Sequence, residues 1–292
     1  VGAGSGRLAI DLLDQLGAGD ALPQRYTILE ISPALAARQS AQLRESLPPE
    51  VVERVRWIDA WSALDWTGGM VIANEVLDAM PVARFRWWPG KPGTAESMRV
   101  GFDGQRFVWE PQPADSALRA AAEAITARIG RSIVPPRETV LAEYNPALEA
   151  WLTEMASALG TSAESWVYLF DYGSHTADVY RADRDEGTLK CHYRHLAHED
   201  PFVYPGLQDI TAWVDFQAVE EAARAAGFAI DGERSQAQWL LGTDVPVAVE
   251  RELQARDSLT EQAQLAQEFR ELVMPTEMGE RFRVMRLRLA RA

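Results

Sequence analysis

The stretch "VGAGSGRLAIDLLDQLG", residues 1–17, decides the fold of this chain. Its glycines, Gly2, Gly4 and Gly6, lead directly into a segment whose apolar residues recur at helical spacing. Glycine lets the backbone approach a ligand closely, and a helix N-terminus presents free N–H groups to a carboxylate or a phosphate. The pattern indicates a ligand-binding turn followed by an amphipathic helix, with an ordinary turn as the alternative.

The next segment, "RYTILEIS", favours the ligand-binding interpretation. It predicts a compact strand from Tyr26 to Leu29 that ends in Glu30. A carboxylate about 20 residues beyond a glycine loop is where nucleotide-binding proteins place the residue that binds ribose. A helix then begins, with Ser32 as its N-cap and Pro33 at its first position. We therefore expect strands and helices that alternate around a bound nucleoside.

The glycine spacing indicates which nucleoside is bound. A dinucleotide-binding loop, GxGxxG, needs glycine at position 7, where this chain has Arg7. The spacing GxGxG favours S-adenosylmethionine over NAD. A third strand, within residues 51–59, ends near Trp57, whose ring suits a wall for adenine, although core packing explains it equally well. After this strand come Asp59, which could accept from the exocyclic amine of adenine, and Ala60.

A second group of candidates lies in "MVIANEVLDAMPV", residues 70–82. The apolar run of residues 70–73 predicts a buried strand, and Asn74 and Glu75 follow it directly. Asp78 comes one helical turn later. The carboxyl ends of such strands face the ligand crevice in open α/β sheets. We expect these residues to be catalytic, with a simple dipole-stabilising role at a helix N-terminus as the alternative for Asp78.

Further substrate-binding candidates come later in the chain. Asp171 and Tyr172 end the strand predicted for "SWVYLFDYG", where ordinary turn residues would also fit. His195 lies in a loop-rich stretch, and we expect it to accept a proton or to order the substrate. The neighbouring histidines follow no fixed helical or hairpin spacing, so we predict no metal site.

The remaining sequence predicts one domain, residues 1–292, with two insertions. Alternating apolar and polar residues at about 83–112, with "FDGQ" as a turn, predict a β-hairpin. The stretch at about 174–210 predicts a functional loop or a local substructure. We find no internal repeat and no low-complexity linker, which favours one domain over two.

Composition excludes several classes of protein. The chain has 292 residues, 47% of them apolar, which is enough to fill a core, and a formal net charge of −14, which argues against nucleic-acid binding. Its single cysteine, Cys191, excludes an intramolecular disulfide and suits a reducing compartment. No stretch approaches the roughly 20 apolar residues that span a bilayer. We expect a soluble protein of the bacterial cytoplasm, or of the mitochondrial matrix in a eukaryote.

Several motifs together resemble one family. They are GAGSG, ILEISP, ANEVLDAMPV, FDYG, YRHLAHEDPFVYPGLQDITAWVDF and MGERFRVMRL. The chain resembles the MidA-type class I methyltransferases over nearly its whole length. This family includes the mitochondrial complex I assembly arginine methyltransferase and its bacterial relatives. The glycine loop is shared by many methyltransferases, whereas NEVLDAMP and DITAWVDF are more specific.

The resemblance implies an α/β fold with a doubly wound, mostly parallel, seven-stranded Rossmann-like sheet, and S-adenosylmethionine as cofactor. It also implies N-methylation of an arginine on a partner protein. Carried over by motif, the three glycines and Glu30 would hold the cofactor, while Asn74, Glu75 and Asp78 would face the acceptor. Family members carry a first strand before the glycine loop, and we expect that strand to be largely absent from residues 1–292. A small-molecule methyltransferase and a non-catalytic assembly factor are the alternatives, and the sequence predicts no oligomeric state.

Overall fold

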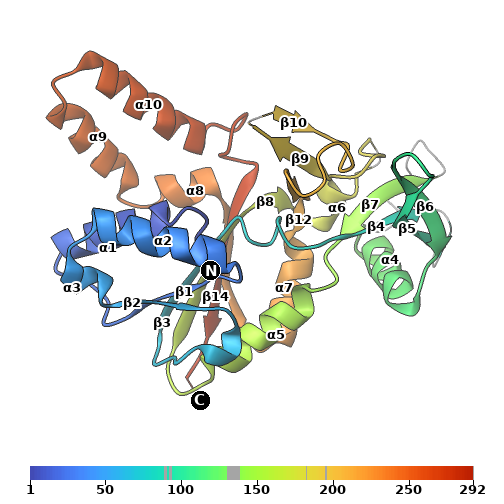
Figure 1. The fold of residues 1–292 in the computed structure, drawn as a ribbon, viewed down its shortest axis with the longest axis horizontal. Coiled ribbons are helices and arrows are strands. Elements are labelled where there is room, and N and C mark those ends of the chain that lie inside the picture. The colour runs from blue at the N-terminus through green and yellow to red at the C-terminus, as the bar shows by residue number, and fades with distance from the viewer. Residues whose placement is uncertain (89–90, 92–93, 130–138, 182, 195, 292) are drawn as a thin grey trace.

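The computed structural model describes residues 1–88, 91, 94–129, 139–181, 183–194 and 196–291. Its largest sheet places four strands side by side in the order β3 (Gly69–Asn74), β8 (Ser165–Ser174), β14 (Phe282–Leu289) and β13 (Ala229–Ser235) (Figure 1). A short strand, β12 (Val214–Asp215), pairs with the end of β8. Both β3 and β12 run parallel to β8, whereas β14 runs antiparallel to β8 and β13.

A second sheet pairs β1 (Tyr26–Leu29) with β2 (Val55–Ile58) in parallel. The backbone N–H group of Gly2 donates to Leu29 at 3.1 Å, and the backbone nitrogen of Val1 donates to Ile72 at 2.8 Å. The first two residues therefore lie between β1 and β3 and join the two sheets.

The strand directions agree with the expected mostly parallel sheet, because β3, β12 and β13 share the direction of β8 and only β14 opposes them. In the described residues, however, the strands do not form one continuous seven-stranded sheet. The described residues form a two-stranded parallel sheet and a five-stranded mixed sheet. Residues 1 and 2 are not part of a strand, and the φ of +61° at Gly2 is left-handed and not extended, so the ladder between β1 and β3 is interrupted where they lie. The predicted bounds of β1 are confirmed, as is the side-chain oxygen of Ser32 as N-cap of the following helix.

Helices cover these sheets and create the main cores. A smaller core joins α1 (Arg7–Ala18), α2 (Pro33–Ser46) and α3 (Pro49–Val52) to β1 and β2. The larger core joins α5 (Leu148–Leu159), α7 (Phe216–Ala225) and the 3-10 turn Trp61–Ala63 to β3, β8 and β14. Three further helices, α8 (Gln236–Leu241), α9 (Val245–Ala255) and α10 (Leu259–Val273), precede β14. None of the helices in the described part of the chain is both long and apolar enough to cross a lipid bilayer.

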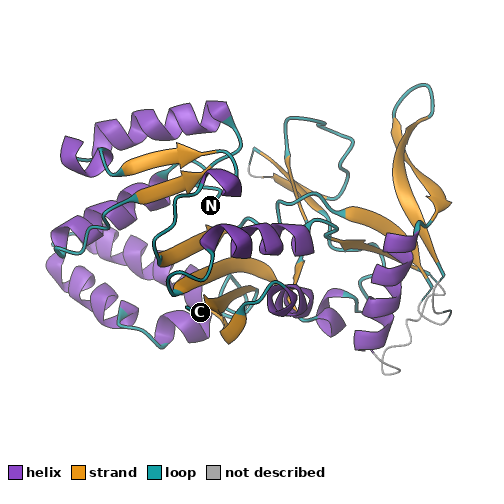
Figure 2. Ribbon diagram, turned by 90° about the horizontal axis from the view of Figure 1, so that it is seen from below, coloured by secondary structure: helices purple, strands orange, loops and turns teal. Residues whose placement is uncertain are grey.

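An antiparallel sheet stands at the other end of the molecule from α1 and α2 (Figures 1 and 2). Its order is β6 (Phe107–Pro113), β5 (Ala95–Phe102), β4 (Ala83–Trp87) and β7 (Val140–Tyr144), and α4 (Ser116–Ile129) packs on it. The hairpin expected at 83–112 is thus part of a larger sheet. The enlargement comes from β7, which lies far along the chain and pairs with β4.

The second expected insertion, residues 174–210, contains local secondary structure. It begins with the short helix α6 (Thr176–Val179). A three-stranded antiparallel sheet follows, in the order β10 (Leu196–His198), β9 (Lys190–Tyr193) and β11 (Asp209–Thr211). This stretch is therefore a small folded unit beside β8 and β12.

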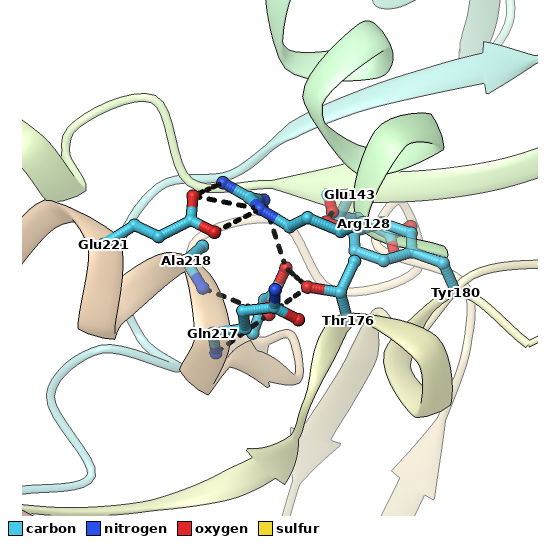
Figure 3. A network of polar contacts seen from close by, with 8 residues as sticks. Arg128, Glu143, Thr176, Tyr180, Gln217, Ala218 and Glu221 are labelled. Carbon is cyan, nitrogen blue, oxygen red and sulfur yellow. Dashed lines mark hydrogen bonds and ion pairs between the residues drawn. The ribbon is translucent and has the colours of Figure 1, made fainter. Parts of the chain in front are cut away.

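A polar network links α4 to α7 (Figure 3). Arg128 on α4 donates to both carboxylate oxygens of Glu221 and lies 3.7 Å from the carboxylate of Asp215. Asp215 in turn caps α7 and accepts from the hydroxyl group of Thr176 at 2.9 Å. Because Arg128 and Asp215 are both largely buried, this network fixes the antiparallel sheet against the main core.

Candidate active site

The glycine loop takes a shape that other residues would strain. The φ angles of Gly2, Gly4 and Gly6 are +61°, +54° and +87°, all in the left-handed region. A Cβ atom added to Gly4 would meet nothing within 4 Å, so the space beside the loop is open to a ligand. Gly6 is the N-cap of α1 and offers no capping side chain, which leaves the first turn available to an anionic group.

Glu30 lies at the carboxyl end of β1, next to the glycine loop. Its side chain is buried, and the whole residue is 8% exposed. The Oε1 atom accepts from the backbone N–H group of Ser32, and Oε2 accepts from the side chain of Gln39, both at 3.0 Å. In the parallel register of β1 and β2, Asp59 and Ala60 follow the neighbouring strand end, where both are exposed. The predicted cofactor-binding residues therefore lie along one edge of the sheet.

The loop after β3 packs directly against the glycine loop. A Cβ atom on Gly2 would come within 2.9 Å of the side chain of Val76. Asn74 and Glu75 are exposed, and the amide group of Asn74 donates to Glu75 at 3.2 Å. Glu75 has a φ of +50°, which is unfavourable for a residue with a side chain and is found preferentially at functional sites. The structure thus brings the predicted cofactor loop and the predicted catalytic loop together.

Asp171 holds the backbone of this predicted catalytic loop. The predicted strand, residues 165–173, is confirmed as β8, which ends one residue later at Ser174, where it pairs with β12. Asp171 is 1% exposed, and its Oδ2 atom accepts from the backbone N–H groups of Val76, Leu77 and Asp78 at 3.2, 2.8 and 3.3 Å. Its carboxylate therefore faces the loop backbone.

Asp78 and Asp171 form a buried carboxyl pair. Burial, together with the charge of Glu75, raises the pKa of Asp78 to about 6. Burial also raises the pKa of Asp171 to about 8, with an added contribution from the charge of Asp78. The Oδ1 atom of Asp78, which is 4% exposed, has no hydrogen-bond partner in the described part of the chain. Near neutral pH the pair therefore retains a proton and has an unused acceptor atom.

The other substrate-binding candidates differ in their surroundings. Tyr172 is partly buried, and its hydroxyl group donates to Thr211 at 2.5 Å. Burial is the largest cause that raises its pKa to about 12, so it stays protonated at neutral pH. Like Asp171, it lies in the last residues of β8, as expected. His195 lies outside the described residues. Among the described residues, no group of three or more His, Cys, Asp or Glu side chains could hold a metal ion.

Gln39 is a site residue that the sequence reasoning missed. It lies on α2 and is completely buried, and it contacts both Glu30 and the glycine loop. The sequence contains a pattern that could have identified Gln39. Gln39 and Leu43 are four residues apart and so share one face of the helix, and both face the core. A glutamine on such a face needs buried hydrogen-bond partners.

Comparisons with known proteins show which family the chain belongs to. The family model described as "Putative S-adenosyl-L-methionine-dependent methyltransferase" matches residues 1–234. The crystal structure of an uncharacterised protein from Burkholderia thailandensis is similar with a TM-score of 0.84 and 35% identity, covering 98% of this chain and 72% of that chain. No curated protein sequence matches the chain.

A second structure from Burkholderia thailandensis is described as a "likely methyl transferase" bound to S-adenosyl-homocysteine. It is similar with a TM-score of 0.81 and 34% identity, covering 98% of this chain and 69% of that chain. The family match covers most of the sequence, and both structural matches cover almost all of it. The chain therefore belongs to this family of S-adenosyl-L-methionine-dependent methyltransferases.

Proposed function

We propose that this protein is an N-methyltransferase of the MidA type that methylates an arginine side chain on a partner protein. Family membership supports methyl transfer from S-adenosylmethionine. The observation that carries the choice of acceptor is the carboxyl cluster beside the glycine loop, in which Asp78 has a buried oxygen atom without a partner among the described residues. A cationic acceptor would supply that missing partner.

The residues present fit the cofactor. The open space beside Gly4 and the uncapped N-terminus of α1 suit the amino-acid part of S-adenosylmethionine. Each carboxylate oxygen of Glu30 has one partner and can accept a second hydrogen bond, as the two ribose hydroxyl groups require. Asp59 would accept from the adenine amine, with Ala60 beside it. The similarity to a protein bound to S-adenosyl-homocysteine supports this assignment.

The acidic loop suits a guanidinium group. Arginine is protonated at all physiological pH values, and carboxylates bind it through paired hydrogen bonds. Glu75 and Asp78 would bind two of its nitrogen atoms and concentrate the positive charge there, which leaves the third nitrogen more nucleophilic. Asn74 holds the carboxylate of Glu75. Tyr172 and His195 stay predicted substrate contacts, whereas Asp171 would act by holding the loop.

These residues also handle the proton that the reaction releases. When bound, S-adenosylmethionine supplies an electrophilic methyl group on a positively charged sulfur. The acceptor nitrogen would form its bond to that methyl group as the carbon–sulfur bond breaks, which leaves S-adenosylhomocysteine, and the nitrogen would lose a proton. Asp78 in its ionised form could receive this proton, because burial and neighbouring charges raise its affinity for protons. Binding of a cation would first favour the ionised form of the pair.

One observation favours a small-molecule acceptor as a second candidate. A cavity of about 550 Å³ lies between α4, α5 and α7, and Leu77 of the catalytic loop lines it. This volume is within the range of pockets that enclose small ligands. Its wall includes Ala212, whose backbone N–H group donates to the carbonyl oxygen of Asp78. A small substrate could therefore approach the loop from this side.

A labelling experiment tests the proposal. The protein is incubated with S-adenosylmethionine labelled in its methyl group and with a cell lysate, and the label is then located by fractionation and amino-acid analysis. We expect the label in methylarginine of a protein. Label in small molecules would refute the protein acceptor, and the absence of both cofactor binding and transfer would favour a non-catalytic assembly factor.

Two variants make the labelling test specific for the acidic loop. Glu75→Gln removes one charge-assisted hydrogen bond, so we expect transfer to fall by about one to two orders of magnitude with nearly unchanged cofactor affinity. Glu45→Gln is the matched control, because Glu45 is exposed on α2. An equal loss of transfer and cofactor affinity in Glu75→Gln would show that Glu75 is a structural residue.

A further inference from the structure

We infer that Gln39 is a positioning residue that holds Glu30 in the orientation needed to bind ribose. The inference rests on the proposed function, because it concerns the same cofactor site. It goes further by assigning the recognition of the ribose hydroxyl groups to an amide on α2 that would not touch the cofactor.

The contacts of Gln39 join three parts of the site. Its Nε2 atom donates to the carbonyl oxygen of Gly4 at 2.9 Å and to Oε2 of Glu30 at 3.0 Å. Its Oε1 atom accepts from the indole N–H group of Trp57 at 2.9 Å. One buried side chain therefore binds the glycine loop, the carboxylate of Glu30 after β1 and the indole ring of Trp57 on β2.

The partners of the amide group determine its orientation. A carbonyl oxygen and a carboxylate oxygen only accept hydrogen bonds, whereas an indole N–H group only donates. Rotation of the amide group of Gln39 by 180° would place like groups against one another at all three contacts. Packing adds a second constraint, because a Cβ atom on Gly6 would lie only 3.3 Å from Cγ of Gln39. The side chain is therefore held in one conformation.

This arrangement leaves acceptor positions on both carboxylate oxygens of Glu30. A neutral amide orients the carboxylate without the competing charge that a lysine or arginine would introduce. With Ser32 on one oxygen and Gln39 on the other, each oxygen keeps one further acceptor position. Two adjacent hydroxyl groups of a ribose match two adjacent acceptors. Without Gln39, the carboxylate of Glu30 would lose one of its two tethers and rotate more freely.

The test compares two ligands that differ by one hydroxyl group. The affinities of S-adenosylhomocysteine and its 2′-deoxy analogue are measured by isothermal titration calorimetry for the wild type and for Gln39→Met. Methionine has nearly the same volume as glutamine and makes none of the three hydrogen bonds. We expect the wild type to prefer the ribose ligand by about tenfold and Gln39→Met to prefer it by only about twofold.

A matched control separates this effect from loss of packing. Gln236 on α8 is also buried, and it donates to the backbone of Leu272 at 3.0 Å, so Gln236→Met makes the same chemical change elsewhere. This control should keep the wild-type preference. If Gln39→Met retained the wild-type preference, or lost affinity for both ligands equally, Gln39 would only be a packing residue and the inference would be overturned.

A second variant covers the case in which Gln39→Met does not fold. Trp57→Phe keeps an aromatic ring but removes the N–H group that holds Oε1 of Gln39. We expect it to reduce the preference for the ribose ligand about twofold, and an unchanged preference would count against the inference. If the wild type bound neither ligand, the proposed function would fail as well. If the wild type bound both ligands and the variants kept the wild-type preference, the inference alone would fail.

Discussion

The buried carboxyl pair predicts an unusual pH dependence of stability, which Asp171→Asn should reveal. Both carboxyl groups have an ordinary pKa of 3.8, and in the folded protein the pKa values are raised to about 6 for Asp78 and about 8 for Asp171. At pH 7 the folded pair therefore binds about one proton more than the unfolded pair. The stability contributed by this pair is present at acidic pH and is lost as the pH rises through both values.

The magnitude follows from the number of protons. One extra bound proton changes the free energy of unfolding by about 1.4 kcal/mol per pH unit. Asparagine keeps an oxygen atom for the loop amides but cannot accept from the N–H group of Tyr172, which Oδ1 of Asp171 accepts at 2.9 Å. We expect Asp171→Asn to cost about 1–3 kcal/mol at pH 6. The deficit should shrink by about 1–2 kcal/mol at pH 8, because the wild type loses stability faster.

Urea unfolding followed by circular dichroism at pH 6, 7 and 8 measures this difference. Asp209→Asn serves as the control, because Asp209 is exposed on β11, and its difference from the wild type should not vary with pH. A deficit of Asp171→Asn that stayed constant or grew with pH would show that Asp171 is ionised in the folded protein. The description of the pair would then be wrong.

Three further predictions concern Glu30, the predicted catalytic loop and the glycine loop. Glu30→Ala should weaken S-adenosylhomocysteine binding by about 1–3 kcal/mol, measured by calorimetry, and an unchanged affinity would remove Glu30 from the site. Glu75→Gly should raise the free energy of unfolding by about 1 kcal/mol, because it relieves the φ of +50°, yet lower methyl transfer; destabilisation would argue against strain. Gly4→Ala and Gly104→Ala both place a side chain at positive φ with nothing within 4 Å, so each should lose about 1–2 kcal/mol of stability. Only Gly4→Ala should also lower cofactor affinity, and an equal affinity in the two variants would contradict the proposed approach of the cofactor to the loop.

Sequence patterns were most informative where structure depends on near neighbours. The glycine loop, the helix after it and the bounds of β1 follow from residues within a few positions of one another. The same holds for the N-cap at Ser32, which binds a backbone group three residues later. The candidate residues at the ends of β1 and β3 could be chosen because carboxyl ends of parallel strands share one edge.

Tertiary structure decided the partners of those residues. Asp171 binds a loop more than 90 residues earlier in the chain, and its burial, not its position in a motif, raises its pKa. Gln39 reaches Trp57 and Gly4 only because α2 packs over both sheet and loop. Likewise, β7 follows α4 in the sequence but pairs with β4 in the antiparallel sheet. Local patterns determine which segments form helices and strands. Contacts between distant segments depend on how these pack together, so hydrogen-bond partners, burial and shifted pKa values emerge only in the folded chain.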